Sequence, residues 1–248
     1  MRSRFLTSLA GIALLAAPVA AHAQGLVLSS MTPTTFSGTG LGSVATLLTL
    51  SSQGNSTSET GCVSYDGSGN VFGGMLGAAG CQGTSADIQT GTSQSQAQLL
   101  SALGITSASQ FGLLFNASEP SGNGVTVQSL TATFYDGTGG LLGSLALTPT
   151  PVSFDNTLTG VGNSGYLFTV SGTPNANFFA AGNYVGLSAT VGCATTESAT
   201  CLGATGGLDT FSLVNAGSPS TVPEPGTYAL LATGLAGLAA VARRRRLS

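Results

Sequence analysis

The sequence predicts an all-β fold, a β-sandwich or jelly roll, followed by one C-terminal transmembrane helix. Short apolar stretches alternate with polar residues, and turns rich in glycine, serine and threonine separate them; the chain contains 37 glycines. Alternation with a period of two is typical of strands that bury one face. Many short strands joined by such turns favour two packed sheets. A repetitive β-solenoid is the alternative, but we find no fixed repeat period.

The clearest strand is predicted at residues 184–191, where every second residue is apolar: Val185, Leu187, Ala189 and Val191. Residues 125–127 and 130–134 have a similar pattern, but the apolar phase shifts near Gln128 and Ser129, which predicts a β-bulge there. The glycine-rich turn at 136–140 joins this segment to a strand at 141–147, so the two are expected to form a hairpin.

Five further strands are predicted from short apolar runs: 26–29, 44–50, 111–115, 166–170 and 210–214. Residues 95–103 are predicted to form the one helix of this region. The exported domain is expected to comprise residues 24–217, with a linker at 218–222.

All basic residues lie at the two ends of the chain. Residues 24–222 contain eight acidic residues and no lysine, arginine or histidine, so their side-chain charge is −8, whereas the whole chain has a net charge of −3. Nucleic-acid binding needs lysine or arginine to displace counterions from phosphates. The charge distribution therefore excludes a nucleic-acid partner. The high apolar content, 42% of residues, argues against disorder.

Residues 1–23 have the three parts of a secretory signal peptide. A basic start is followed by an apolar run at 5–17, and then by the small residues Ala21 and Ala23 that signal peptidase reads. Cleavage is expected before Gln24.

Residues 223–248 predict a second signal. The stiff stretch Pro223, Glu224 and Pro225 precedes sixteen uncharged residues at 227–242. As a helix they span roughly 24 Å, a little less than the ~30 Å hydrocarbon core of a membrane. The basic cluster that follows should stay on the cytoplasmic side; it consists of Arg243, Arg244, Arg245 and Arg246.

These C-terminal features resemble the PEP-CTERM sorting domain of Gram-negative bacteria. Residues 228–231 resemble the aromatic-Ala-Leu-Leu that often follows the motif, with Tyr228 where tryptophan is common. The resemblance implies recognition by exosortase, a membrane-embedded cysteine protease. It also implies an inner-membrane intermediate held by the C-terminal helix, then delivery to the cell surface or extracellular matrix. Substrates in that family are associated with exopolysaccharide and the biofilm matrix, so exopolysaccharide is an expected partner.

Four cysteines fall into two close pairs, Cys62 with Cys81 and Cys193 with Cys201. An even number of cysteines in an exported protein favours disulfides. Three pairings are formally open, and we expect the two local ones. A zinc site is the alternative, but there is no Cys-x-x-Cys spacing and no histidine in the exported region.

No cofactor is expected, with one open alternative. Asp66, Ser68 and Asn70 place oxygen atoms at alternate positions, as the start of a calcium-binding EF-hand loop does. The match ends at Val71, where that loop needs glycine, and at Gly77, where it needs glutamate. A polar turn is the simpler interpretation, and calcium binding is the alternative.

The sequence favours a non-catalytic structural or adhesive protein of the envelope or exopolysaccharide matrix. Without histidine or lysine in the exported region, Ser-His-Asp and Schiff-base mechanisms are excluded. One alternative is a secreted carbohydrate-active hydrolase with paired carboxylates drawn from Glu119, Asp136, Asp155 and Glu197. The other alternative is a single-pass membrane protein whose anchor stays uncut.

The charge distribution predicts resistance to trypsin. Because trypsin cleaves after lysine and arginine, the region 24–222 should survive digestion even when it is unfolded in urea. Mass spectrometry of the digest is the measurement, and fragments that end within 24–222 would contradict the prediction.

Overall fold

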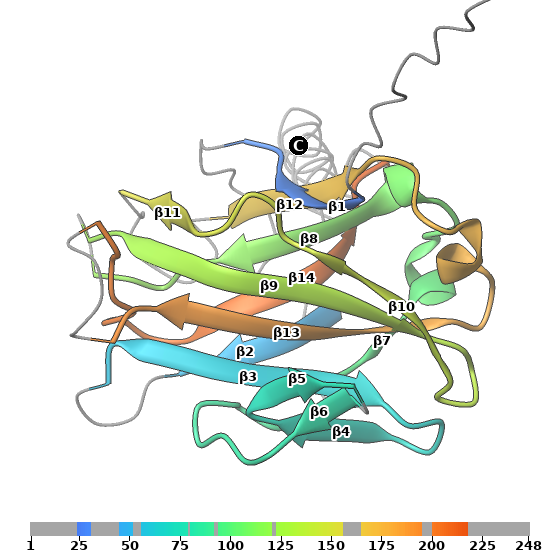
Figure 1. Ribbon diagram of the computed structural model, residues 1–248, viewed down its shortest axis with the longest axis horizontal. Coiled ribbons are helices and arrows are strands. Elements are labelled where there is room, and N and C mark those ends of the chain that lie inside the picture. The colour runs from blue at the N-terminus through green and yellow to red at the C-terminus, as the bar shows by residue number, and fades with distance from the viewer. Residues whose placement is uncertain are drawn as a thin grey trace, which may run out of the picture.

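Two β-sheets form most of the molecule (Figure 1). The computed structural model describes residues 24–30, 45–51, 56–78, 80–91, 94–120, 123–155, 165–194 and 200–217. Strands dominate these ranges, and the helices among them are three 3-10 turns: η1 (Leu100–Leu103), η2 (Ala108–Gln110) and η3 (Ala176–Phe179). The predicted all-β class is therefore confirmed.

The first sheet has five antiparallel strands that run in the order β1, β12, β8, β14, β2. Their bounds are β1 (Gly25–Leu28), β12 (Gly165–Ser171), β8 (Phe111–Asn116), β14 (Asp209–Asn215) and β2 (Ala45–Leu50). Strands adjacent in this sheet are far apart in the sequence, so most of its hydrogen bonds are long-range.

The second sheet has seven strands, five of which run in the order β10, β9, β13, β3, β4. Their bounds are β10 (Leu141–Ala146), β9 (Val125–Tyr135), β13 (Tyr184–Gly192), β3 (Ser58–Tyr65) and β4 (Asn70–Gly73). Two short strands complete it: β11 (Val152–Phe154) pairs with β9, and β7 (Gln98–Leu99) pairs with β13.

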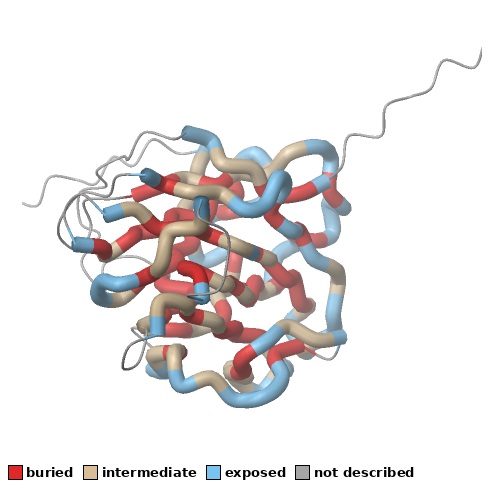
Figure 2. The backbone as a smooth tube through the Cα atoms, turned by 60° about the vertical axis from the view of Figure 1, so that its left-hand side comes forward, coloured by how far each residue is buried: buried red, intermediate tan, exposed pale blue. Residues whose placement is uncertain are grey.

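The two sheets face each other across one hydrophobic core. Phe111 from the first sheet contacts Phe134 from the second, with ring centroids 5.5 Å apart. Phe115 stacks on Phe211 at 4.6 Å, and Phe134 stacks on Phe178 at 4.7 Å. Figure 2 shows that the buried residues follow the strands while exposed residues concentrate in the connections. Burial of these aromatic side chains and of the aliphatic side chains around them is the dominant favourable contribution to folding.

The strongest sequence patterns correspond to real strands. The apolar residues predicted to share one face at 185–191 are all buried in β13. The predicted bulge is also present, because β13 pairs Thr190 with Ser129 and then Val191 with Val127, so the register skips one residue of β9. The predicted hairpin is the pair β9 and β10.

One central strand, β3, escaped prediction. Its inward-facing residues are Glu59, Gly61 and Val63, so only one of the three has an apolar side chain. Gly61 is needed because a Cβ there would collide with Ile88 and would lie 2.9 Å from a methyl carbon of Leu50. The neighbouring strands β13 and β4 specify β3 by pairing with it. The alternation of apolar and polar residues within β3 is too weak to predict a strand from the sequence.

The helix predicted at 95–103 is wrong. Only η1 is helical, and the residues before it run beside β2. The Ser95 hydroxyl accepts from the Thr49 N–H at 3.0 Å, and the Gln96 N–H donates to the Leu47 carbonyl at 3.1 Å. These backbone groups are used between segments, so they are not available for helical hydrogen bonds.

Both expected disulfides are present, Cys62–Cys81 with Cα atoms 5.7 Å apart and Cys193–Cys201 with Cα atoms 6.0 Å apart. The first ties β3 to a separate two-stranded hairpin, β5 (Met75–Gly77) and β6 (Gly80–Gln82). In Figure 1 this hairpin lies over β3 and β4.

Removing either disulfide should lower the free energy of unfolding. Chain-entropy reasoning gives about 3 kcal/mol for Cys62→Ser with Cys81→Ser, which opens the longer loop, and about 2.5 kcal/mol for Cys193→Ser with Cys201→Ser. Urea unfolding followed by circular dichroism measures both values. Unfolding midpoints equal to that of the unmodified protein would contradict the prediction.

Candidate functional site

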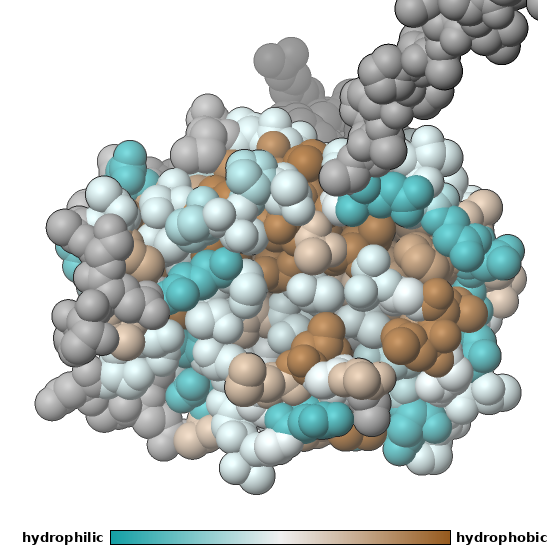
Figure 3. Space-filling model, viewed as in Figure 1, coloured by the Kyte–Doolittle hydropathy of each residue, from teal (hydrophilic) through white to brown (hydrophobic). Residues whose placement is uncertain are grey.

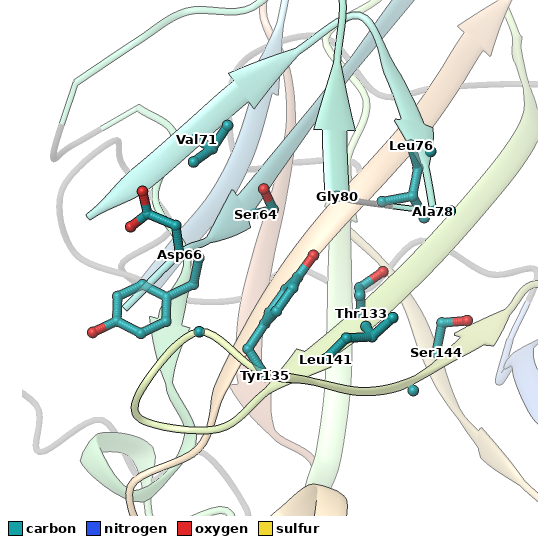
Figure 4. Close-up of a pocket in the computed structure, with 14 residues that line it drawn as sticks. Ser64, Asp66, Val71, Leu76, Ala78, Gly80, Thr133, Tyr135, Leu141 and Ser144 are labelled. Atoms are coloured by element: carbon teal, nitrogen blue, oxygen red, sulfur yellow. The ribbon is translucent and has the colours of Figure 1, made fainter. Parts of the chain in front are cut away.

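A pocket of about 460 Å³ lies on the outer face of the seven-stranded sheet (Figure 4). Its floor consists of strand residues that point away from the core, Ser64 on β3 and Thr133 and Tyr135 on β9. The intervening strand β13 has Gly186 opposite Thr133. Glycine has no side chain. At this position, therefore, no side chain of β13 stands between Thr133 on β9 and the part of the pocket that β3 lines.

The β5–β6 hairpin forms one wall of the pocket, through Leu76, Gly77, Ala78 and Gly80. Gly80 has a φ of 94°, in the left-handed region that glycine favours. A Cβ at this position would lie only 3.0 Å from the Ser64 hydroxyl oxygen. The neighbouring Cys81 is bonded to Cys62 on β3, so the disulfide positions this wall over the sheet.

Two aspartate-capped turns approach the opposite end of the pocket. Asp66 Oδ1 accepts from the Ser68 and Gly69 N–H groups, both at 2.8 Å. Asp136 Oδ1 accepts from the Thr138 N–H at 2.8 Å and from the Gly140 N–H at 2.9 Å.

These capping bonds set the charge of the two carboxylates. Hydrogen bonds from Ser68 lower the pKa of Asp66, and the hydroxyl of Thr138 is the main cause of the lowered pKa of Asp136. Hydrogen bonds favour the ionised form. Both carboxylates are therefore negative at neutral pH.

The two turns touch through glycines. A Cβ at Gly67 would collide with the Thr138 carbonyl, and a Cβ at Gly139 would collide with the backbone of Asp66. Both glycines have positive φ, 89° and 87° respectively. Only glycine fits at either position, because the backbone conformation is left-handed and the space for a side chain is absent.

Two buried hydroxyls on the pocket floor lack hydrogen-bond partners. Tyr135 and Thr133 are each only 4% exposed, and neither Tyr135 Oη nor Thr133 Oγ1 has a partner among the described residues. Burial raises the pKa of Tyr135. The Ser64 and Thr133 hydroxyls oppose this effect because they lie close enough to Tyr135 Oη to stabilise the phenolate, although neither makes a hydrogen bond of good geometry with it. The phenol therefore stays protonated and can both donate and accept. Figure 4 shows its hydroxyl directed between Ser64 and Gly80.

The three calcium-ligand candidates do not all point to one place. Asp66 Oδ1 is occupied by the turn, where it also accepts from the Ser68 hydroxyl at 2.9 Å. Asn70 Oδ1 accepts from the Ala97 N–H at 2.8 Å. Within the described ranges no cluster of three or more histidine, cysteine, aspartate or glutamate residues could hold a metal ion. That the protein binds no cofactor stays a prediction, and calcium at Asp66, Ser68 and Asn70 stays its alternative.

A second group of acidic residues is buried. Glu59, Glu119 and Asp209 are at most 3% exposed. The Asp209 carboxyl accepts from the Ser118 N–H at 2.9 Å through Oδ1. Glu119 accepts from the Thr205 N–H at 2.9 Å and from the Thr205 hydroxyl at 3.0 Å.

Burial and like charges raise the pKa of Asp209 well above its ordinary range. Desolvation is the main cause, and the charges of Glu59 and Glu119 add to it. Desolvation also raises the pKa of Glu119. Since the region 24–222 has no cation to compensate these carboxyls, protonation is the available way to neutralise them.

The carboxylates considered for a hydrolase are not brought together as an accessible pair. Asp136 caps a turn, Glu119 is buried, and Asp155 lies exposed after β11 beside a separate pocket of about 540 Å³. Glu197 lies outside the described residues.

The sequence analysis did not predict the pocket residues Ser64, Thr133 and Tyr135. Their outward alternation along β9 was visible, but only the sheet order brings Ser64 beside them.

The predicted signals at the two ends lie largely outside the described residues. This holds for Ala21, Ala23, the Pro-Glu-Pro stretch, the helix at 227–242 and the arginine cluster, whereas Gln24 is described immediately before β1. In the part of the chain that the structure describes, no helix is long and apolar enough to cross a membrane.

Comparison with protein-family models identifies the PEP-CTERM protein-sorting motif over residues 221–246. The chain therefore carries this sorting motif, as its C-terminal residues predicted. The motif indicates an exported protein that is processed by an exosortase and reaches the envelope or surface through a membrane-anchored intermediate. No curated protein and no solved structure matches the chain.

The raised pKa of Asp209 predicts that this residue destabilises the fold increasingly as pH rises. A carboxyl whose folded pKa is raised loses stabilising free energy as pH rises from its unfolded pKa, about 4, towards its folded pKa. Asp209→Asn removes this ionisation. The variant should therefore be more stable than the unmodified protein at pH 8, by roughly 1–3 kcal/mol, and the difference should shrink towards pH 4.

Urea unfolding at pH 4, 6 and 8 measures this dependence. Asp155→Asn is the matched control for the substitution itself, because Asp155 is exposed. An Asp209→Asn variant that loses stability as pH rises relative to the unmodified protein would contradict the assignment.

Proposed function

We propose that this chain is an exported, non-catalytic structural or adhesive protein of the cell envelope or extracellular matrix. The PEP-CTERM motif at residues 221–246 is the observation that carries the proposal, because it indicates the route of sorting. A secretory signal at residues 1–23 would start export, and exosortase would release or transfer the domain near Pro223.

The folded domain suits such a role. Strands β2, β14, β8 and β12 lie side by side in one sheet, and β3, β13, β9 and β10 lie side by side in the other. This strand order supports the proposal of a jelly roll, a compact architecture with two Greek keys. Two disulfides close local loops, and disulfides persist in the oxidising compartments outside the cytoplasm.

The non-catalytic part of the proposal rests on the residue inventory. A polysaccharide hydrolase would need two accessible carboxylates flanking the bond to be broken. The carboxyls that influence one another most strongly, Asp209, Glu59 and Glu119, are buried. A reducing-end assay on neutral and acidic polysaccharides should therefore stay at background.

Processing is tested by the intact mass of the protein in the envelope and medium fractions of producing cells. We expect a mass that starts at Gln24 and ends between residues 222 and 226. Substituting alanine for Pro223, Glu224 and Pro225 together should leave the C-terminal segment attached. Ser220→Ala, a change just upstream of the motif, is the control and should be processed normally. If the protein isolated from these cells retains Arg243 to Arg246, exosortase processing is overturned and a single-pass membrane protein is indicated.

A further inference from the structure

The pocket on the outer face of the seven-stranded sheet has polar groups that the fold does not use. Tyr135 Oη and Thr133 Oγ1 are buried and have no hydrogen-bond partner among the described residues. A buried hydroxyl without a protein partner is unfavourable, so a ligand group that bonds to it contributes to the binding free energy. A volume of about 460 Å³ is within the usual range for small-molecule sites, about 300–1,000 Å³.

The charge around the pocket selects against anions. No lysine, arginine or histidine occurs anywhere between residues 24 and 222. Asp66 lines the pocket and is ionised at neutral pH. A phosphate, sulfate or carboxylate would therefore meet a negative charge and find no cation to compensate it.

The remaining polar groups are neutral hydroxyls. Ser64 and Ser144 line the pocket together with Thr133 and Tyr135. A hydroxyl both donates and accepts, so this set matches a ligand whose own polar groups are hydroxyls.

Apolar and aromatic surfaces complete the lining. Leu141 at the pocket is 59% exposed, and the Tyr65 ring is stacked on Tyr184 with centroids 3.9 Å apart. Surfaces of this kind can cover the C–H groups of a ring. From this side of the molecule, Figure 3 shows separate hydrophobic patches in a surface of mostly intermediate hydropathy.

We propose that this pocket binds a neutral, hydroxyl-rich ring ligand, a sugar residue or a similar polyol, with Tyr135 and Thr133 as its buried hydrogen-bonding groups. The proposal deepens the adhesive role proposed above by naming its ligand class. Binding is measured on purified protein and does not depend on sorting, so the two proposals can fail separately.

The test is a titration of the purified full-length protein. The probes are the methyl glycosides of glucose, galactose and mannose, the neutral polymers dextran, galactan and mannan, and glucuronate as the anionic counterpart. Tyrosine fluorescence is a direct readout because the chain has no tryptophan, and calorimetry provides the dissociation constant.

We expect at least one neutral probe to bind and glucuronate to bind at least about tenfold more weakly than glucoside. Binding of the glycoside by itself would assign a free monosaccharide, whereas binding of the polymer alone would assign a residue within a chain. No binding of any neutral probe up to solubility-limited concentration would overturn the proposal, as would stronger binding of glucuronate.

Two substitutions test the named residues. Tyr135→Phe and Thr133→Val should each weaken binding by roughly three- to tenfold, the loss of one neutral hydrogen bond, without lowering stability. Thr210→Val is the matched control, because Thr210 Oγ1 is also a buried hydroxyl without a partner among the described residues but lies in the other sheet. Equal affinities for the pocket variants and the unmodified protein would overturn the assignment.

A second pair of variants distinguishes a loss of ligand binding from a loss of folding. Ser144 is exposed on β10 and lines the pocket, so Ser144→Leu should narrow the pocket and reduce binding while the domain stays folded. Ala146→Leu, an exposed position on the same strand that does not line the pocket, should bind normally. Equal binding by the two variants would place the ligand elsewhere and overturn the proposal.

Discussion

The absence of cationic side chains between residues 24 and 222 is the constraint on which the domain's polar structure depends. No carboxylate in that region can be neutralised by a side-chain ion pair with another residue of the region. The structure uses two other solutions. On the surface, Asp66 and Asp136 accept backbone N–H groups and cap turns as ionised groups. In the interior, Glu119 bonds to Thr205, and Asp209 lies where burial favours its protonated form.

The same constraint gives the rest of the fold its character. Cohesion comes from apolar burial between the sheets and from backbone hydrogen bonds across long sequence separations, as between β14 and β8. Glycine allows the close approaches that this packing needs. Gly61 makes room for Ile88 in the core, and Gly67 and Gly139 let two turns meet outside it. The domain is therefore stabilised by apolar packing and hydrogen bonding, and all its charged side chains are acidic.

The pocket depends on this frame. Its floor belongs to rigid strands, whereas its wall is a small hairpin tied to the sheet by Cys62–Cys81. A neutral set of hydroxyls in a negative domain favours neutral ligands over anions. Such a site is compatible with a role outside the cell, which the sorting motif at 221–246 indicates independently. The motif concerns delivery, and the pocket concerns recognition.

From the sequence by itself we could predict the two end signals, the all-β class, the strand at 184–191, the bulge near Gln128 and Ser129, and both disulfide pairs. Each of these depends on a local pattern or spacing. Only the tertiary structure decided the rest. β3 is a strand because β13 and β4 pair with it, although its inward side chains barely alternate. Residues before Leu100 are extended because β2 uses their hydrogen-bonding groups. The pocket unites Ser64 with Tyr135, residues far apart in the sequence, since sheet order follows long-range pairing that no local pattern encodes.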